Sequence, residues 1–349
     1  GSLTFMRILI VTDACPEHVL NGVTRSYSRL EIELKKMGHK VSYIKPTQFF
    51  TVPMPKYNEI KLAINVWKVG KLIKKEMIEA QNNNEQFRIH IATEGPIGLS
   101  ARRYLGRNKI KFTTSFHTRF DKYLKLYLPI IPEKISQKFL SNFHNKAERV
   151  LVTTESMKKE LSDIGVINDK MVVWTRGADH LGEPKKMTLN YNKPIFVYVG
   201  RIALEKNIKD FLDLDLPGKK ILVGTGPHLK KLTKEYPDAK FVGQKTNGEL
   251  ASYFASADVF VFPSKTETFG IVCIESLMAG TPVAGYADCP GTMDIFKLAN
   301  GKSIGCLDKD LKKAALTALK ADRDNCKEFA KQFTWKRCAE IFINNTAVN

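Results

Sequence analysis

Short apolar runs rich in β-branched residues alternate along the chain with stretches in which apolar residues recur every three or four positions. The runs predict buried strands, and the periodic stretches predict amphipathic helices. In the N-terminal half, strands are expected at 7–12, 38–46, 88–93, 111–117 and 149–154, and helices at 22–37, 65–80, 97–106 and 133–147. Because strands that alternate with helices usually pair in parallel, this order predicts a doubly wound α/β sheet.

The same alternation begins again after a polar, proline-bracketed joint at 177–194. Two Rossmann-like domains are therefore expected, 1–183 and 184–332, followed by a C-terminal segment 333–349. Because open α/β sheets bind ligands at the carboxyl ends of their strands, a cleft facing both sets of strand ends is expected. In the second domain, strands are expected at 194–201, 219–226, 239–244, 257–264 and 281–286, and helices at 206–214, 228–235, 270–280 and between 244 and 257.

The composition agrees with two folded domains, because 349 residues of which 43% are hydrophobic can build two cores. Residues 1–5 precede Met6 and look like a remnant of an expression vector. Six cysteines without a CxxC pair favour a reducing compartment and argue against a zinc site. No run of the sequence approaches the roughly 18 apolar residues of a membrane-spanning helix.

The net charge of +19 is large, and residues 102–149 alone hold 12 Lys and Arg against 3 Asp and Glu. Such an excess favours an anionic partner: nucleic acid, an anionic membrane or a phosphorylated ligand. The alternative is a charge that serves solubility only. No nucleic-acid-binding motif is present, so a nucleic-acid partner is not expected.

Candidate chemistry lies where the predicted strands end. Gly22 begins a helix after the loop that follows the first strand, and helix N-termini favour phosphate. Arg201 and Lys206 follow the strand 194–201 and could neutralise a diphosphate. Gly226, in "GTGP", allows close backbone approach after the next strand. An ordinary turn and two solvated bases are the alternatives.

Two carboxylates bracket the stretch "ETFGIVCIE", Glu267 and Glu275. Gly270 should begin a helix that carries Glu275 about one and a half turns in, while Glu267 stays in the loop. The two acids can therefore contact the two ends of one ligand, or be surface charges. His117 follows a strand of the first domain and is either structural or part of the cleft. The D-x-D triplets at 213–215, 308–310 and 322–324 are interpreted as solvated faces that do not end buried strands.

Taken in order, "PEHVLNGV", "SFHTRF", "VGRIALEKN", "GTGP" and "ETFGIVCIE" resemble the family 4 retaining glycosyltransferases of the GT-B fold. The last is similar to the E-x7-E motif of that family, and "FTWKRCAEIFI" resembles its closing helix, which returns to the N-terminal domain. The resemblance covers nearly the whole chain. "TEGPIGLSARRY" and "SFHTRF" are most similar to the diacylglycerol glycosyltransferase, sulfoquinovosyl-diacylglycerol synthase and α-mannosyltransferase branch. One departure is Ala178 before Asp179, where the family often has Gly-Val-Asp.

The resemblance implies a retaining, metal-independent transfer of a hexose from a nucleotide sugar to an acceptor. His117 would lie beside the donor sugar, Arg201 and Lys206 would stabilise the leaving diphosphate, and no metal would be needed. Glu267 would bind the sugar hydroxyls with help from the Phe269 and Gly270 amides. The donor-binding set is implied to be Gly22, Arg201, Lys206, Gly226, Glu267, Phe269, Gly270 and Glu275, the last at the ribose.

The acceptor is expected in the more basic N-terminal domain. Segments 64–80 and 119–139 mix apolar and basic residues, which suits an anionic membrane surface, or simply amphipathic core helices. With the resemblance, they favour a lipid acceptor such as diacylglycerol, a UDP-sugar carrying glucose or glucuronate, and an enzyme on the cytoplasmic face of the membrane. The alternatives are a GDP-mannose-dependent α-mannosyltransferase, a sugar-nucleotide epimerase, a nucleic-acid-binding protein and an inactive lipid-binding module.

Overall fold

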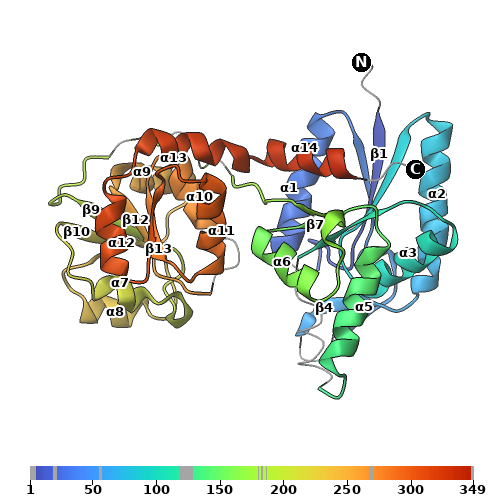
Figure 1. Cartoon of the computed structure of the whole chain (residues 1–349), viewed down its shortest axis with the longest axis horizontal. Helices are drawn as coiled ribbons and strands as arrows, with labels where there is room; N and C mark the ends of the chain where they lie inside the picture. The colour runs from blue at the N-terminus through green and yellow to red at the C-terminus, as the bar shows by residue number, and fades with distance from the viewer. Residues whose placement is uncertain are drawn as a thin grey trace. The chain divides into compact units, whose positions relative to one another are not determined.

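The computed structural model divides the chain into two compact units (Figure 1). Unit 1 comprises Gly1–Gly177 with Trp335–Asn349, and unit 2 comprises Ala178–Thr334. The boundary between the units lies inside the predicted joint. The structure describes residues 5–18, 22–54, 57–117, 129–179, 181, 184–185, 187–266 and 270–346, without the side chains of 57–60.

Unit 1 contains a six-stranded parallel sheet in the order β2-β1-β5-β6-β7-β8. The five strands predicted for this half are confirmed, but β8 and an antiparallel hairpin, β3–β4, were not predicted. β8 is only three residues long, and the hairpin carries Pro53 and several charges, so neither gives a clear apolar run. The strands are β1 (Met6–Val11), β2 (Lys40–Ile44), β3 (Thr51–Met54), β4 (Tyr57–Ala63), β5 (Gln86–Ile91), β6 (Thr113–Phe116), β7 (Val150–Val152) and β8 (Met171–Val173).

The helices of unit 1 pack on both faces of this sheet and form two apolar clusters with it. All four predicted helices are present, and α6, which was not predicted, begins after Thr154, whose hydroxyl accepts from the Met157 amide. They are α1 (Gly22–Lys36), α2 (Val69–Asn82), α3 (Pro96–Arg107), α5 (Glu133–Asn145) and α6 (Glu155–Asp163), with short 3-10 helices η1 (Pro46–Gln48), η2 (Val66–Lys68) and η3 (Asn168–Lys170).

The last helix, α14 (Trp335–Asn345), belongs to unit 1 and packs beside α1, as expected from the sequence (Figure 1). The Trp174 indole donates to the Cys338 carbonyl at 3.0 Å, and the Phe342 ring lies 5.5 Å from the Trp174 ring. Arg88 on β5 donates to the carbonyl of Ile343. These buried contacts attach the end of the chain to the face of the sheet that α1 covers.

Unit 2 repeats the design with a parallel sheet ordered β11-β10-β9-β12-β13-β14. The five predicted strands are confirmed, and β14 was not predicted. The strands are β9 (Ile195–Val199), β10 (Lys219–Val223), β11 (Lys240–Phe241), β12 (Val259–Phe262), β13 (Val283–Tyr286) and β14 (Gly305–Asp308). The helices are η4 (Leu204–Lys206), α7 (Ile208–Leu212), α8 (Leu229–Glu235), α9 (Asn247–Ser256), α10 (Ile271–Met278), α11 (Pro290–Ala299), α12 (Leu311–Ala318), α13 (Arg323–Ala330) and η5 (Lys331–Phe333).

Two apolar clusters lie in unit 2, and they share the inner strands β9 and β12 between them. Since all strands of each sheet run parallel, their carboxyl ends gather at one edge per unit, and the loops from that edge carry the candidate residues. Among the helices that the structure describes, none is long and apolar enough to cross a membrane.

Candidate functional site

A buried cluster of hydroxyl and imidazole groups lies at the carboxyl edge of the unit 1 sheet. The Tyr27 hydroxyl of α1 lies 2.5 Å from Ser115 Oγ, and 3.0 Å from both His90 Nε2 and His117 Nε2. His117 Nε2 also lies 2.9 Å from Ser115 Oγ, and His90 Nδ1 lies 2.8 Å from Thr113 Oγ1. His117, predicted from the sequence, thus belongs to a network that joins β5, β6 and α1.

The Tyr27 hydroxyl, Ser115 Oγ and His117 Nε2 lie within hydrogen-bond distance of one another, and Ser115 Oγ also lies 3.3 Å from the Ala92 carbonyl. Either hydroxyl can donate within this triangle, and the tautomer of His117 decides whether Nε2 donates or accepts. His117 Nδ1 is buried and has no partner among the described residues, so it is available to a ligand group.

Burial keeps this network neutral. Desolvation lowers the pKa of His90 to about 3, helped by the neighbouring imidazoles. Desolvation and then the Arg176 charge lower the pKa of His117 to about 3. Burial also raises the pKa of Tyr27 above its usual range. At neutral pH the His117 imidazole is therefore uncharged, with a proton on one ring nitrogen and a lone pair on the other.

Asp13, in the loop after β1, connects that loop to the start of α3. Its carboxylate accepts from the Ile97 amide at 2.7 Å, the Gly98 amide at 3.1 Å and the Thr93 hydroxyl at 2.6 Å. Burial raises the pKa of Asp13 to about 6 although these donors act in the other direction. The Asp13 carboxylate therefore caps the N-terminus of α3 although Asp13 lies outside that helix, and it joins the loops that follow β1 and β5.

A second carboxylate, Glu94, lies beside this edge and is held by a histidine. Glu94 Oε1 lies 2.7 Å from His144 Nε2, and His144 Nδ1 lies 2.8 Å from Thr114 Oγ1. The His144 side chain is fully buried and that of Glu94 is 9% exposed. Within the described residues, His144 is the hydrogen-bond partner that orients this carboxylate.

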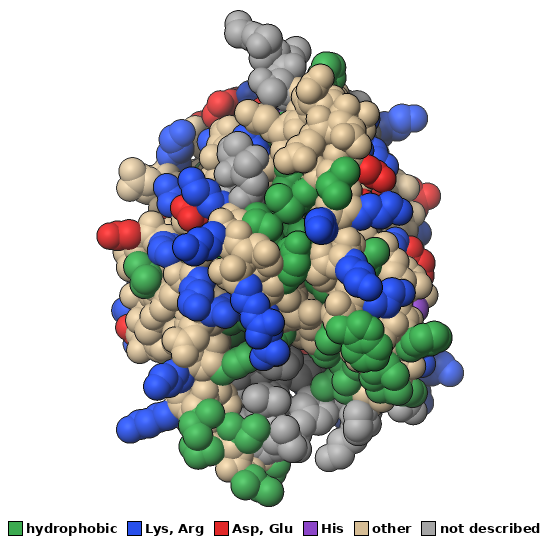
Figure 2. All heavy atoms as spheres, turned by 90° about the vertical axis from the view of Figure 1, so that its right-hand side faces the viewer, with side chains coloured by type: hydrophobic (Ala, Val, Ile, Leu, Met, Phe, Trp, Pro, Cys, Tyr) green, Lys and Arg blue, Asp and Glu red, His purple; other side chains and the backbone are tan. Residues whose placement is uncertain are grey.

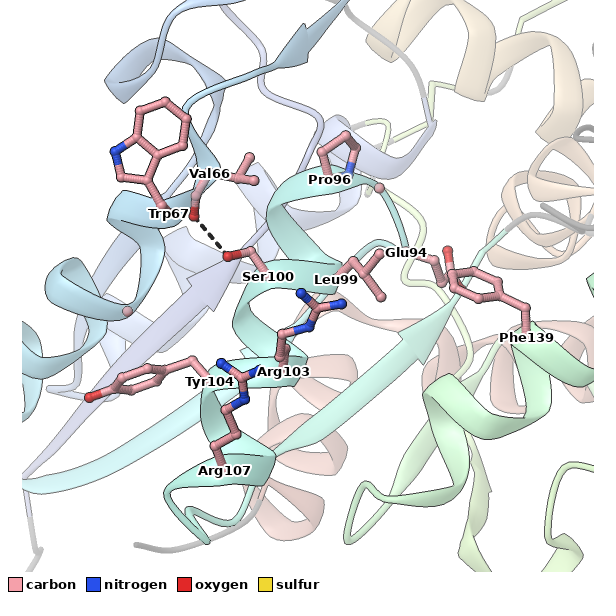
Figure 3. Close-up of a pocket in the computed structure, with 12 residues that line it drawn as sticks. Val66, Trp67, Glu94, Pro96, Leu99, Ser100, Arg103, Tyr104, Arg107 and Phe139 are labelled. Carbon is pink, nitrogen blue, oxygen red and sulfur yellow. Dashed lines mark hydrogen bonds between the residues drawn. The ribbon is translucent and has the colours of Figure 1, made fainter.

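Glu94 also lines a groove of about 810 Å³ between η2, α3 and α5 (Figure 3). The Ser100 hydroxyl donates to the Val66 carbonyl at 2.7 Å and joins two of its walls. The wall is mainly apolar, with two arginines along α3. The lining residues are Val66, Trp67, Gly70, Glu94, Gly95, Pro96, Leu99, Ser100, Arg103, Tyr104, Arg107 and Phe139.

Large apolar side chains are exposed next to the groove. Phe50 is 74% exposed and Trp67 77%, and Val52 and Ile64 are exposed as well. The Ile64 amide donates to the Phe50 carbonyl at 2.9 Å, so the four side chains come from adjoining backbone, and we call them the apolar edge. Figure 2 shows hydrophobic side chains gathered in the lower part of this face and Lys and Arg distributed above them. Of the basic, apolar segment 119–139, residues 119–128 lie outside the described part.

In unit 2, Arg201 and Lys206 follow β9 as predicted. Arg201 is exposed, and its carbonyl accepts from the Tyr198 hydroxyl at 2.8 Å, which fixes the backbone of the turn. Lys206 is half-buried and ends η4, directly before α7. Two cations therefore lie within one short connection at the carboxyl edge of the second sheet.

Gly226 lies in the loop after β10, which packs directly on the Arg201 loop. The Ile202 amide donates to the Thr225 carbonyl at 3.0 Å, and the His228 amide donates to the Ile202 carbonyl at 3.0 Å. A Cβ on Gly226 would lie 2.3 Å from the Ile202 oxygen, so no larger residue fits. Glycine here allows two strand-end loops to meet backbone to backbone.

Gly270 precedes α10 with φ of +26°, in the left-handed region that favours glycine. Glu275 lies in the second turn of α10, as predicted, and is half-buried. Burial, and then the Asp179 charge, raise the pKa of Glu275 to about 7. Gly22 begins α1 as predicted, whereas Glu267 and Phe269 lie outside the described residues.

The D-x-D triplets have local structural roles. Asp310 and Asp322 are the N-caps of α12 and α13, each accepting from two backbone amides. We predict that no triplet ends a buried strand; Asp308 of 308–310 is the last residue of β14, whose four residues are all half-buried and not buried. That strand is half-buried and mixed in composition, so its end had no apolar signal. Among the described residues, no cluster of three His, Cys, Asp or Glu could hold a metal ion.

Several residues of the unit 1 site were not predicted: Asp13, Tyr27, His90, Glu94, Ser115 and His144. Asp13 and Glu94 directly follow predicted strands, so the rule used for His117 could have found them. Tyr27 and His144 lie within helices, and His90 and Ser115 within strands. Only the three-dimensional packing brings these four to the edge of the sheet.

Two parallel Rossmann-like sheets with a closing helix define a GT-B fold. Anabaena HepE, solved in complex with UDP, superposes with a TM-score of 0.63 at 14% identity, covering 97% of this chain and 99% of that one. Residues 20–180 match the family described as Glycosyltransferase Family 4, and residues 182–333 match Glycosyl transferases group 1. The chain belongs to the family 4 glycosyltransferases of the GT-B fold, and it is a glycosyltransferase.

Curated relatives of the chain include glycosyltransferases with different named activities. Sulfoquinovosyl transferase SQD2 of Arabidopsis thaliana is 25% identical over 83% of this chain, which spans 61% of the length of that relative. Alpha-monoglucosyldiacylglycerol synthase of Streptococcus pneumoniae is 26% identical over 97% of this chain and 83% of its own. A GDP-mannose-dependent alpha-mannosyltransferase of Corynebacterium glutamicum is 27% identical over 80% of this chain and 72% of its own.

Proposed function

We propose that this enzyme transfers a hexose, with retention, from a nucleotide sugar to a lipid alcohol such as diacylglycerol. The main observation that supports this proposal is that unit 1 combines an apolar groove with a polar cluster at the ends of its strands. A lipid acceptor needs both an apolar wall for its chains and fixed polar groups near its reacting hydroxyl. The name of one relative, an alpha-monoglucosyldiacylglycerol synthase, supports this acceptor class.

The donor is proposed to bind at the strand ends of unit 2. Arg201 and Lys206 are positioned to stabilise the leaving diphosphate, and the close backbone packing at Gly226 allows phosphate to approach amides. Glu275 is proposed at the ribose, and Glu267, Phe269 and Gly270 at the sugar, with Gly22 at the donor phosphate. In this proposal the cations replace a metal, and a UDP-linked glucose or glucuronate is favoured.

His117 is proposed to accept a hydrogen bond from a donor-sugar hydroxyl through Nδ1. The neutral state of the imidazole suits this role, because a charged ring would have no lone pair to offer. Its fixed orientation through Tyr27 and Ser115 limits the entropy lost when the sugar binds.

The apolar edge is proposed to rest on the cytoplasmic face of an anionic membrane. Exposed Trp67 and Phe50 can enter the headgroup region, while Lys68, Lys71 and Arg103 around the groove favour anionic lipid. An aromatic and basic surface of this kind binds reversibly, and it would bring the groove to the plane in which the acceptor diffuses.

Release of nucleoside diphosphate from UDP-glucose, UDP-glucuronate and GDP-mannose, with and without diacylglycerol vesicles, tests this function. The proposal expects release from one donor that depends on the vesicles, together with a glycolipid product. Release from GDP-mannose alone would favour the alternative that the mannosyltransferase relative supports. Isomerisation of the donor without an acceptor would identify an epimerase and contradict the proposal.

A further inference from the structure

We propose that Glu94, held by His144, is the recognition point for the acceptor hydroxyl at one end of the groove. The ligand class is a neutral alcohol on an apolar chain, bound with its hydroxyl at the Glu94 carboxylate. This assignment rests on the proposed function. It adds to that function the residue that binds the acceptor hydroxyl, and it specifies that the head of the acceptor is uncharged.

The first argument is the rigidity of the carboxylate. The hydrogen bond of 2.7 Å from His144 fixes one Glu94 oxygen, and the bond of 2.8 Å between His144 and Thr114 fixes the imidazole. An ionised carboxylate accepts from His144 Nε2–H, so Nδ1 accepts from the Thr114 hydroxyl. A carboxylate in such a frame is a preorganised acceptor for a hydroxyl donor, because its orientation is determined before the ligand binds.

The second argument is position. The Glu94 side chain is 9% exposed, and Glu94 is among the residues that line the groove, as Figure 3 shows. Among the described residues that line the groove, Glu94 is the one with an acidic side chain. Burying a carboxylate this deeply costs free energy. An uncharged residue at this position would avoid that cost if the role of the side chain were packing alone.

The third argument concerns the neighbouring cluster. The His144 ring lies 5.7 Å from the Phe116 ring, and Phe116 directly precedes His117 in the chain. Glu94 follows β5 and His117 follows β6, and these strands are paired in the sheet. A hydroxyl bound at Glu94 therefore lies at the same sheet edge as the residue proposed to contact the donor sugar.

The fourth argument excludes an anionic head at this point. A phosphate or sulfate placed against Glu94 would meet a like charge in a partly buried site, which disfavours binding. The cations of the groove, Arg103 and Arg107, lie two and three turns further along α3 from Pro96. The charge distribution thus matches an uncharged alcohol at Glu94, with anionic lipid excluded from that end.

The test compares Glu94→Gln with wild-type enzyme and with Glu148→Gln, a matched change of an exposed carboxylate in unit 1 outside the groove. Transfer to diacylglycerol in vesicles gives acceptor KM and kcat, and calorimetry with the donor nucleotide gives donor Kd. We expect Glu94→Gln to raise the acceptor KM roughly 10- to 100-fold, with an unchanged donor Kd and an unchanged Tm. Glu148→Gln should match the wild type in every readout.

Two outcomes overturn the assignment. The first is an acceptor KM and kcat of Glu94→Gln equal to those of the wild type. The second is a Glu94→Gln variant whose donor affinity falls as much as its acceptor affinity, or whose Tm falls, because either would identify a structural role. In that case Glu94→Asp, which keeps the charge, should show the same losses as Glu94→Gln. If the wild type uses only water-soluble alcohols, the lipid proposal fails, while a raised KM of Glu94→Gln for that alcohol would still support the assignment.

Discussion

The carboxyl edges of the two sheets are built differently, although the folds of the two units are alike. In unit 1 the edge is a network of buried, neutral side chains around Tyr27 and His117, bordered by the histidine-held Glu94. In unit 2 the edge consists of glycine turns that pack backbone to backbone, with exposed Arg201 and half-buried Lys206 beside them.

This contrast indicates two modes of recognition. Neutral groups of fixed orientation can select hydroxyls by geometry, whereas cations and backbone amides can stabilise charge that develops on a leaving group. We therefore expect changes at the unit 2 edge to affect the chemical step and changes at the unit 1 edge to affect orientation.

The largest effect should come from Arg201, the exposed cation at the carboxyl edge of the unit 2 sheet. Arg201→Ala should lower kcat by roughly 10²–10³, because in the proposed function it removes one charge that stabilises the leaving diphosphate. Steady-state release of nucleoside diphosphate checks this, with Lys230→Ala on α8 as a control. A kcat within twofold of the wild type would remove Arg201 from the leaving-group site.

Glu275 offers a test by pH. The pKa of its carboxyl is about 7 in the folded protein against an ordinary value of 4.5, so between these values the folded state binds more protons than the unfolded state. The free energy of unfolding therefore falls as the pH rises from about 4.5 to about 7 and is constant above. Glu275→Gln, which does not titrate, should be more stable than the wild type by roughly 1–3 kcal/mol at pH 8, and the difference should vanish near pH 4.

Thermal unfolding without nucleotide, at pH 8 and pH 4, measures this difference. A difference of the same size at both values would show that the substitution acts through packing and not through the charge.

In unit 1, Tyr27→Phe removes one hydroxyl from the buried network and keeps the ring. The His117 imidazole then loses the Tyr27 hydroxyl and keeps Ser115 as a partner, and we expect kcat to fall about tenfold, the value of one hydrogen bond near 1.4 kcal/mol. ¹⁵N NMR of the His117 ring should show a changed tautomer population. If kcat falls while the tautomer population of His117 is unchanged, Tyr27 does not act through the His117 ring.

The smallest effect should be at the apolar edge. Trp67→Ala should weaken binding to anionic vesicles about threefold to tenfold and leave donor affinity unchanged, because only interfacial area is lost. Vesicle co-sedimentation checks this, with Ile167→Ala, an exposed apolar residue beyond the apolar edge, as the control. Equal effects of the two variants would contradict membrane docking at this face.

The sequence predicted the regular part of the fold and the unit 2 edge better than the unit 1 edge. Ten strands gave apolar runs, and Arg201, Lys206 and Gly226 lie in loops that follow such runs directly. Short or mixed strands such as β8 and β14 gave no such run. Tyr27, His90 and His144 lie inside elements and are far apart in sequence, so only the pairing of β5 with β6 and the packing of α1 bring them to one edge.

The central claim, a sugar transfer to a lipid alcohol, is tested most directly by product analysis. Purified enzyme is incubated with a UDP-sugar and vesicles of diacylglycerol in anionic phospholipid, and nucleoside diphosphate and glycolipid are measured together. The account predicts equal amounts of both products, and release that stops when diacylglycerol is omitted from the same vesicles. Release that continues without diacylglycerol, or a sugar recovered only on a water-soluble acceptor, would contradict it.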